Sequence, residues 1–387
     1  MTFDPGLLDR VRRRLADDPD EPDLRRLAAA LRTETRGPVG AGDLLRALPQ
    51  LRAELFGAGP LDALLRDPRT TDVLVNGPAE VWVDQGQGLL RADVGFPDAA
   101  AVRRLAGRLA AVGGRRLDDA QPWVDVRLPD GTRLHAVLPP LASRGPYLSL
   151  RVLRHRAFTL DELVAAGTLS AAGAALLQAI VAGRLAFLVC GGTGSGKTTL
   201  LSTLLGCVPA QERIVVVEDC VELRPAHPHV LSLEARLANV EGAGAITLRD
   251  LVRQALRMRP DRLVVGEVRG AEVIELLTAL NTGHEGGAGT LHANSGRDVP
   301  ARLEALAGLG GMAAAALHSQ LGAAVHCVLH LRRDGPRRVL EEVSVLHRRG
   351  PRVGVLPAWR RDGQPAPGRA FLAELLAERG ADPAALR

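Results

Sequence analysis

The chain has 387 residues, of which 46% are hydrophobic, 24% are charged and only 3% are aromatic. This length exceeds what a single compact core usually accommodates, so we expect two or three domains, and the apolar content excludes a wholly disordered chain. The formal net charge of +5 is modest, and one Tyr, three Trp and six Phe leave little material for stacking nucleic-acid bases.

The chain contains few cysteines and a single lysine. The four cysteines are scattered with no C-x-x-C pair, which excludes a disulfide framework and a structural zinc knuckle and favours a reducing compartment. Arginine supplies 48 of the 49 basic residues, so Lys197 is the only lysine. A lysine kept against this background indicates a site where a guanidinium cannot replace an ammonium. The N-terminal segment shows no signal peptide, so we expect a cytoplasmic protein.

The first 154 residues predict two parts. Residues 1–55 contain short helical patterns broken by prolines, and we expect a helical N-terminal extension. Residues 56–154 contain short alternating runs separated by turns such as Asn76-Gly77 and Asp130-Gly131, which predict an α+β module with an antiparallel sheet. The expected strands and helix of this module are 73–75, 81–83, 123–128, 133–138 and 147–153, and 99–111, respectively. Residues 155–167 are then expected to form a hinge.

Residues 168–345 alternate apolar runs with helical patterns, which predicts an α/β fold with a largely parallel sheet and helices on both faces. The helix over 248–258 is marked by Thr247 as N-cap and by Asp250, which completes a capping box. The other expected elements are the strands 185–190, 214–218 and 263–266 and the helices 197–205 and 271–281.

Two features bear on the membrane. The uncharged stretches 163–183 and 305–331 are long enough to cross a bilayer, but their Ala, Gly, Gln and His content favours buried elements of a soluble domain and no transmembrane segment.

Residues 346–387 are expected to form a basic, Pro/Gly-rich tail. The basic excess there begins earlier, with nine Arg against four acidic residues over 332–362. It predicts a solvated surface, with docking to acidic lipid or a partner as the alternative.

The sequence GGTGSGKT, from Gly191 to Thr198, satisfies the phosphate-binding pattern G-x-x-x-x-G-K-[ST] in full. Its glycines let backbone N–H groups point at phosphate oxygens, and the following helix adds its positive end. Lys197 is expected to reach the β- and γ-phosphates, and Thr198 to bind Mg²⁺. A glycine-rich turn without a ligand is the alternative. The expected nucleotide-binding residues are Gly191, Gly192, Thr193, Gly194, Ser195, Gly196, Lys197, Thr198 and Thr199.

Carboxylates follow two buried strands downstream. The run 214–217 ends in Glu218 and Asp219, and the run 263–265 is followed by Glu267. In an open α/β sheet such residues reach the edge where the ligand binds, so they are expected to hold Mg²⁺ or to orient the attacking water. Solvated strand ends are the alternative, but the adjacent P-loop favours a catalytic role.

Residues 282–294 are Gly-rich and contain two histidines, His284 and His292. A metal site is one interpretation, but no third ligand keeps close spacing. We expect instead a loop near the γ-phosphate, with His292 as a neutral hydrogen-bond partner or charge sensor.

Together these stretches resemble a known family. The P-loop, RIVVVEDCVEL at 213–223, RMRPDRLVVGEVRGAE at 257–272 and TGHEGGAGTLHANS at 282–295 are similar to the Walker A, Asp box, Walker B and His box of the type II and type IV secretion ATPases, the GspE-like superfamily. Upstream, TDVLVNGPAEVWVD at 71–84 resembles the N-terminal domain of that family. The resemblance spans about residues 55–345 and is strongest to the CpaF/TadA branch, which drives tight-adherence (Flp) pili.

The resemblance implies a RecA-like P-loop motor domain, a PAS-like N-terminal domain, a homo-hexameric ring, and ATP with Mg²⁺. By position, Glu218 and Glu267 become the acidic catalytic pair, with Glu267 also holding Mg²⁺ through water, and His292 becomes the His-box histidine. The arginines implied to reach the phosphates are Arg133 and Arg151, and less closely Arg144. The implied partners are inner-membrane platform proteins, at the inner face of the cytoplasmic membrane.

Other functions remain open at this level. A conjugation-associated or other nucleic-acid translocating ATPase of RecA type is the main alternative, although no aromatic platform or basic stripe supports it. A nucleotide-switched scaffold and a small-molecule kinase fit less well.

Overall fold

The computed structural model describes residues 5–15, 24–35, 48–49, 51–152, 157–236, 238, 243–335 and 337–386. The chain divides into two compact units, Met1–Arg154 and His155–Arg387. Each unit is described on its own.

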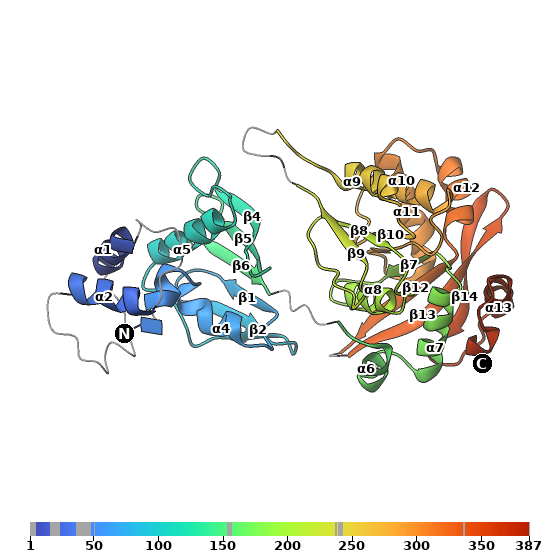
Figure 1. Ribbon diagram of the computed structural model, residues 1–387, viewed down its shortest axis with the longest axis horizontal. Helices are drawn as coiled ribbons and strands as arrows, with labels where there is room; N and C mark the ends of the chain where they lie inside the picture. The colour runs from blue at the N-terminus through green and yellow to red at the C-terminus, as the bar shows by residue number, and fades with distance from the viewer. Residues whose placement is uncertain are drawn as a thin grey trace. The chain divides into compact units, whose positions relative to one another are not determined.

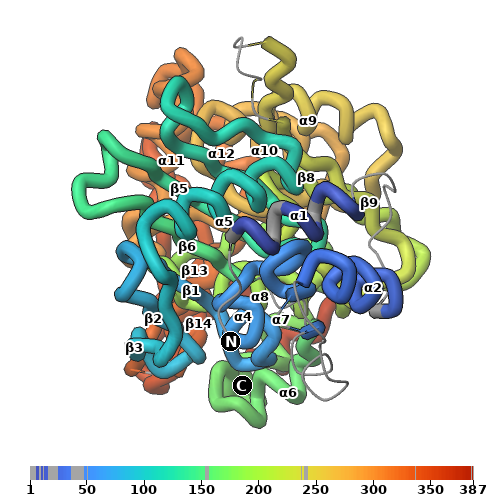
Figure 2. Tube along the Cα trace, turned by 90° about the vertical axis from the view of Figure 1, so that its left-hand side faces the viewer, coloured from blue at the N-terminus to red at the C-terminus, as the bar shows by residue number. Residues whose placement is uncertain are grey.

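The N-terminal unit begins with two helices, α1 (Pro5–Leu15) and α2 (Leu24–Glu34), which pack against each other (Figures 1 and 2). Their apolar faces meet Leu51 and Leu55 in a small separate core. The described residues of the expected extension are therefore mostly helical. The breaks expected near residues 19–22 and 37–38 lie outside the described residues.

A six-stranded antiparallel sheet forms the rest of this unit, in the order β3-β2-β1-β6-β5-β4. Helix α5, with its N-cap Asp98, packs Val102, Leu105 and Leu109 on one face of the sheet. The predicted strands and helix are all present, but β3 was not predicted, because its exposed residues do not alternate in polarity. The elements are η1 (Gly59–Leu61), α4 (Asp62–Arg66), β1 (Asp72–Val75), β2 (Val81–Asp84), β3 (Leu89–Arg91), α5 (Ala99–Val112), β4 (Trp123–Arg127), β5 (Arg133–Val137) and β6 (Tyr147–Arg151).

The C-terminal unit is built on an eight-stranded sheet, in the order β14-β13-β12-β7-β11-β10-β8-β9. The strands from β12 to β9 are parallel, and β13 and β14 extend the sheet in antiparallel fashion. These strands are β7 (Phe187–Cys190), β8 (Ile214–Glu218), β9 (Val230–Glu234), β10 (Arg262–Val265), β11 (Ala288–Leu291), β12 (Cys327–Asp334), β13 (Arg337–Arg349) and β14 (Arg352–Arg360).

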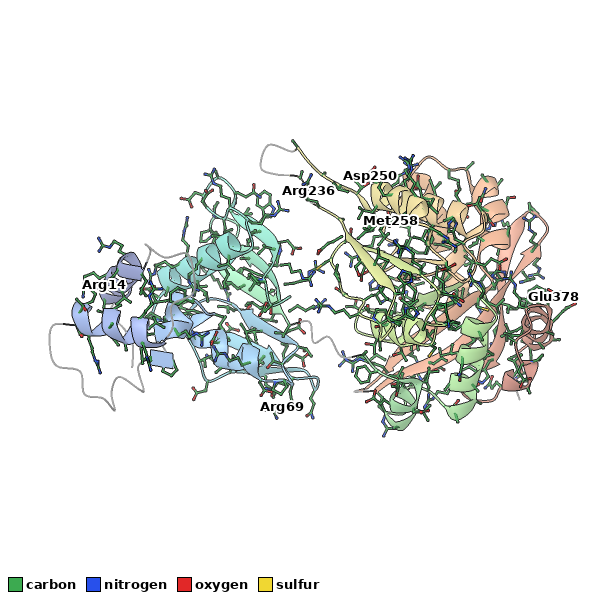
Figure 3. The ribbon with its side chains drawn as sticks, in the orientation of Figure 1. Arg14, Arg69, Arg236, Asp250, Met258 and Glu378 are labelled. Carbon is green, nitrogen blue, oxygen red and sulfur yellow. The ribbon has the colours of Figure 1, made fainter. Side chains whose placement is uncertain are left out.

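Helices cover both faces of this sheet (Figure 1), which confirms the predicted fold class. Helices α6, α7, α8 and α13 contribute to one hydrophobic core, and α9, α10, α11 and α12 to the other. Thr247 and Asp250 form the predicted capping box of α9, and Figure 3 labels Asp250 there. The helices are α6 (Leu160–Ala165), α7 (Ala171–Ala182), α8 (Lys197–Gly206), α9 (Leu248–Ala255), η2 (Leu256–Met258), α10 (Glu272–Leu280), η3 (Gly296–Asp298), α11 (Val299–Leu309), α12 (Ala314–Ala324), α13 (Arg369–Glu378) and η4 (Pro383–Leu386).

The predicted hinge and the predicted tail both contribute to the folded C-terminal unit. Within the predicted hinge, Thr159 caps α6, and Leu163 is buried in the core. The predicted tail is wrong as a tail, because β13 runs past residue 345, and β14 and α13 follow. Leu372 and Leu376 of α13 are fully buried. Several arginines of this segment lie at the ends of β13 and β14. They give the segment a basic composition, although its inward-facing residues are apolar.

The two uncharged stretches form short elements of this unit. Residues 163–183 span parts of α6 and all of α7, and residues 305–331 span parts of α11 and β12 with all of α12 between them. Among the residues that the structure describes, no helix combines the length and the apolar character needed to cross a membrane.

Candidate active site

The phosphate-binding loop connects the carboxyl end of β7 to the N-terminus of α8, as predicted from the sequence. Gly191, Gly194 and Gly196 have φ values of +153°, +69° and +93°, a region that side chains rarely tolerate. At Gly191 a Cβ would also lie 2.3 Å from the carbonyl oxygen of Leu331 in β12. The loop therefore requires glycine for its path, and it ends at the N-terminus of a ten-residue helix, where N–H groups lack helical partners.

Lys197 lies under this loop, with only 8% of the residue exposed. Its Nζ atom donates to the carbonyl oxygens of Gly191, at 3.0 Å, and Gly192, at 2.9 Å. Burial lowers the pKa of Lys197, and the neighbouring carboxylate of Glu267 counteracts this. The ammonium group is thus held beside the loop, where an anion would offer it a better partner than neutral carbonyls do.

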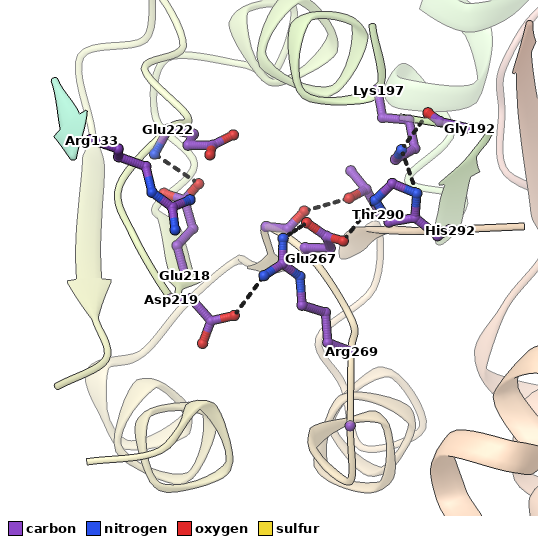
Figure 4. Close-up of polar contacts among 12 residues, drawn as sticks. Arg133, Gly192, Lys197, Glu218, Asp219, Glu222, Glu267, Arg269, Thr290 and His292 are labelled. Atoms are coloured by element: carbon purple, nitrogen blue, oxygen red, sulfur yellow. Dashed lines mark hydrogen bonds and ion pairs between the residues drawn. The ribbon is translucent and has the colours of Figure 1, made fainter. Parts of the chain in front are cut away.

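Glu267 follows β10 and has both carboxylate oxygens engaged (Figure 4). Oε1 lies 3.0 Å from Nε2 of His292, and Oε2 accepts a 2.6 Å hydrogen bond from Nη2 of Arg269. Burial by itself raises the pKa of Glu267, but the hydrogen bond and charge of Arg269 outweigh it and lower the pKa below its usual value. The structure thus keeps this carboxylate ionised and fixed in orientation.

His292 lies between Glu267 and Lys197. Its Nδ1 atom is 3.5 Å from Nζ of Lys197, and burial together with that charge lowers the pKa of His292. A neutral ring with its proton on Nε2 satisfies both neighbours, because Nε2–H then donates to the carboxylate and Nδ1 accepts from the ammonium. The expected loop at 282–294 is wrong in part, since residues 288–291 form the buried central strand β11. His292 therefore sits at the end of a strand.

Glu218, at the end of β8, occupies a contrasting environment. It is 4% exposed, and its Oε1 atom accepts hydrogen bonds from the backbone N–H groups of Glu222 and Leu223, at 3.1 and 3.0 Å. Its buried Oε2 atom has no partner among the described residues. Burial raises the pKa of Glu218 to about 7. Gly266 makes the room, because a Cβ there would lie 2.4 Å from Cγ of Glu218.

The structure adds Arg269 to the predicted residues. Its guanidinium bridges Glu267 and Asp219, with 3.9 Å from Nη1 to Oδ2 of Asp219. The buried carboxylate of Glu272 accepts hydrogen bonds from the backbone N–H groups of Arg269 and Gly270, which fixes this turn. Sequence reasoning missed Arg269, because one arginine among 48 carries no signal beyond its place two residues after Glu267.

Two of the predicted arginines of the N-terminal unit lie at directly paired positions of neighbouring strands in its sheet. Arg133 is paired with Arg151 across β5 and β6, and Arg127 of β4 is paired with Arg133 on the other side. Arg151 is also paired with Asp72, to which its Nε atom donates at 3.2 Å. Arg144 lies outside this row, in the turn between β5 and β6. The register thus gathers Arg127, Arg133 and Arg151.

The residues around the loop fit a nucleotide with Mg²⁺. Ser195 Oγ is buried and has no partner among the described residues, and Lys197 is held only by loop carbonyls and His292. Thr198 and Thr199 lie in the first turn of α8. In the described part of the chain no group of three or more His, Cys, Asp or Glu could hold a metal ion by itself. A Mg²⁺ ion at Thr198 and Glu267 would therefore share phosphate oxygens as ligands.

Comparisons with known proteins identify the family. The family model described as "Type II/IV secretion system protein" matches residues 54–349. The putative conjugal transfer protein Rv3659c of Mycobacterium tuberculosis (strain H37Rv) is 58% identical over 348 residues, which cover 88% of this chain and 99% of that protein. The type IV secretion system protein PtlH of Bordetella pertussis is 33% identical over 324 residues, with 76% and 91% covered.

Solved structures share the fold. The pilus retraction motor PilT with bound ADP matches with a TM-score of 0.53 at 21% identity, covering 73% of this chain and 81% of that chain. The Legionella pneumophila ATPase DotB matches with a TM-score of 0.50 at 16% identity, covering 83% and 91%. These similarities show that the chain shares the α/β fold of these two ATPases.

Proposed function

The chain belongs to the type II/IV secretion system protein family, as one of its ATPases, and we propose that it converts ATP hydrolysis into movement of pilin subunits or other macromolecular substrates across the cell envelope. The observation that carries the proposal is the continuous contact from Lys197 through His292 to Glu267 beneath a complete phosphate-binding loop. Three segments that are far apart in the sequence meet there.

Each residue of this network has a proposed role in hydrolysis. The loop backbone and Lys197 bind the β- and γ-phosphates, and the ammonium exchanges loop carbonyls for phosphate oxygens when the nucleotide arrives. Mg²⁺, held by Thr198 and through water by Glu267, would neutralise charge on the phosphates. Glu267, oriented by Arg269 and His292, positions the attacking water.

Glu218 and Glu267 are proposed to share the acid–base work. Their environments displace the two pKa values in opposite directions, so that at neutral pH one carboxylate is fully ionised while the other titrates. Glu218 is therefore suited to take up and release a proton near pH 7, whereas Glu267 holds a constant negative charge.

Assembly into a homo-hexamer is proposed from the resemblance to the secretion ATPases, and the row of arginines gives such an assembly a role in hydrolysis. Arg133 and Arg151 lie in a different unit from the phosphate-binding loop, so they contribute to hydrolysis only where an N-terminal unit meets a motor unit, in the same or a neighbouring subunit. Guanidinium groups that reach the phosphates only on closure couple hydrolysis to rigid-body movement. The proposed setting is the inner face of the cytoplasmic membrane, against platform proteins of a tight-adherence (Flp) pilus or a related secretion system.

A conjugative role is the second candidate. It is favoured by the name of the 58% identical relative from Mycobacterium tuberculosis, a putative conjugal transfer protein. In that case the same type of motor serves conjugal transfer, and the active-site chemistry is unchanged.

Steady-state hydrolysis by the purified chain tests the proposal. We expect Mg²⁺-dependent ATP hydrolysis that Lys197→Ala abolishes, together with a large loss of nucleotide affinity. A direct effect of DNA is tested by adding single- and double-stranded DNA of fixed length. Stimulation of turnover by DNA would favour a nucleic-acid translocase, and a Lys197→Ala variant with normal turnover would refute this loop as the active site.

A further inference from the structure

The hairpin of β12 and β13 lies directly beside the phosphate-binding loop. Strand β12 pairs in parallel with β7, the strand that leads into the loop, and places His330 opposite Cys190. The next residue of β12, Leu331, brings its carbonyl oxygen to 2.3 Å from the position a Cβ would take at Gly191. The hairpin therefore contacts the start of the loop through its backbone.

Arg338, near the start of β13, contacts the later part of the same loop. Its Nε atom donates a 3.1 Å hydrogen bond to the carbonyl oxygen of Gly194. The carbons of its side chain lie along Gly196, where a Cβ would be 3.4 Å from Cδ of Arg338. Arg338 thus contacts two of the loop glycines that have positive φ.

The hydrogen bond from Arg338 holds the carbonyl end of the Gly194–Ser195 peptide. Space around Gly194 is open, since a Cβ there would have no neighbour within 4 Å. In a trans peptide the C=O and N–H groups point in opposite directions, so a carbonyl held toward Arg338 turns the N–H of Ser195 to the inside of the loop. That N–H makes a long 3.4 Å contact with the carbonyl oxygen of Gly192. Inward N–H groups are those that bind phosphate in such loops.

The charge of Arg338 is also uncompensated. In the described part of the chain no carboxylate pairs with its guanidinium, whereas the neighbouring Arg332 pairs with Asp334 and Glu341. A guanidinium next to a phosphate-binding loop raises the local potential for an anion, and no carboxylate among the described residues offsets that charge.

We propose that Arg338 is a positioning residue for the nucleotide, which presets the Gly194–Ser195 peptide for phosphate binding and adds positive potential beside the loop. From the sequence alone, Arg338 was predicted only to belong to a basic surface segment. The inference rests on the proposed function, because it assumes that the loop binds a nucleotide. Since Arg338 acts through the loop and not on the γ-phosphate or the attacking water, its contribution appears in affinity and not in the chemical step.

Calorimetric titration with ADP, together with ATPase kinetics, tests this role. We expect Arg338→Ala to weaken ADP binding and raise the KM for ATP by on the order of tenfold, the effect of one hydrogen bond to a charged group, with kcat within about twofold of wild type. Arg338→Met keeps the stem along Gly196 and loses the donor, so it decides the question if the alanine variant is poorly folded. Arg338→Lys keeps the charge and should recover part of the affinity.

Arg337→Ala is the matched control, because it removes the adjacent exposed arginine of the same strand, whose register partner is Asp334. It should bind ADP as wild type does. Wild-type ADP affinity in both Arg338→Ala and Arg338→Met, or a loss confined to kcat, would overturn the inference. Failure of the wild-type chain to bind ADP would instead refute the proposed function.

Discussion

Nε2 of His292 lies 3.0 Å from Oε1 of Glu267, while Nδ1 of the same ring faces the ammonium group of Lys197 at 3.5 Å. One imidazole thus contacts both Lys197 and the carboxylate that we propose positions water. A neutral ring has one donor and one acceptor, so it can bond to both neighbours at once, and we propose that it links phosphate binding to the orientation of Glu267.

The first prediction concerns this link. His292→Asn should lower kcat on the order of 100-fold, because an Asn side chain is too short to span both neighbours, while ADP affinity stays within about threefold of wild type. Single-turnover and calorimetric measurements on the same preparation separate the two quantities. His284→Asn, in the segment before β11, is the matched control and should leave kcat unchanged. A His292 variant with normal kcat would show that the link has no catalytic role.

The second prediction concerns Glu267. Glu267→Gln keeps the size of the side chain but removes the charge that pairs with Arg269 and orients water. We expect ATP to remain bound and hydrolysis to fall on the order of 1,000-fold, which traps the ATP state. The bound nucleotide can be identified by chromatography after rapid desalting. Recovery of ADP at the wild-type rate would move the water-positioning role to Glu218.

The third prediction is a pH dependence of stability. Burial raises the pKa of Glu218 from 4.5 to about 7. Below about pH 4.5 the carboxyl group is protonated in folded and unfolded chains alike. As pH rises from 4.5 to 7 only the unfolded chain ionises, so the free energy of unfolding falls by up to about 3 kcal/mol and then stays level.

Glu218→Gln removes this dependence. The free energy of unfolding of the variant, relative to wild type, should therefore rise between pH 5 and pH 8, as measured by urea denaturation at each pH. The change with pH is the quantity to compare, since the buried amide has its own constant cost. Parallel stability curves for the two proteins would indicate that Glu218 is ionised in the folded chain already at pH 5.

The fourth prediction concerns the arginine row. Arg133→Ala and Arg151→Ala should bind ATP normally but turn over on the order of 100-fold more slowly, by analogy with arginine fingers. Arg103→Ala, which removes a partly exposed arginine of α5 that is paired with Asp119, is the control within the same unit. Specific activity of the wild type should also fall on dilution as the ring dissociates. Constant activity per subunit down to monomer would contradict the proposed hexamer.

The sequence predicted much of the fold because its signals are local. The glycines and Lys197 of the phosphate-binding loop, and the Thr247–Asp250 capping box, specify geometry within a few residues. The strand β11 was predicted as a loop, because Gly286, Gly287 and Gly289 resemble a flexible segment. In the fold Gly287 and Gly289 lie against neighbouring backbone, where a Cβ would come within 2.6 and 3.2 Å of carbonyl oxygens.

The parts of the site that escaped prediction depend on long-range pairing. Arg269 and Arg338 are two of 48 arginines, and only the tertiary fold shows that one contacts Glu267 and the other Gly194. Arg133 and Arg151 were expected from the family resemblance, but their alignment with Arg127 in one row follows only from strand register across three strands. No local pattern distinguishes these residues from solvated arginines.

The order of strands also sets a condition for the return of activity on refolding. Strand β11 lies between β7 and β10 but follows both in the chain, so the middle of the sheet stays open until residues 288–291 enter it. A nascent chain that has reached Glu267 holds the phosphate loop and both carboxylates without the strand that sets their spacing. Recovery of ATPase activity therefore requires β11 to be inserted between β7 and β10, and it can serve as a readout of that step.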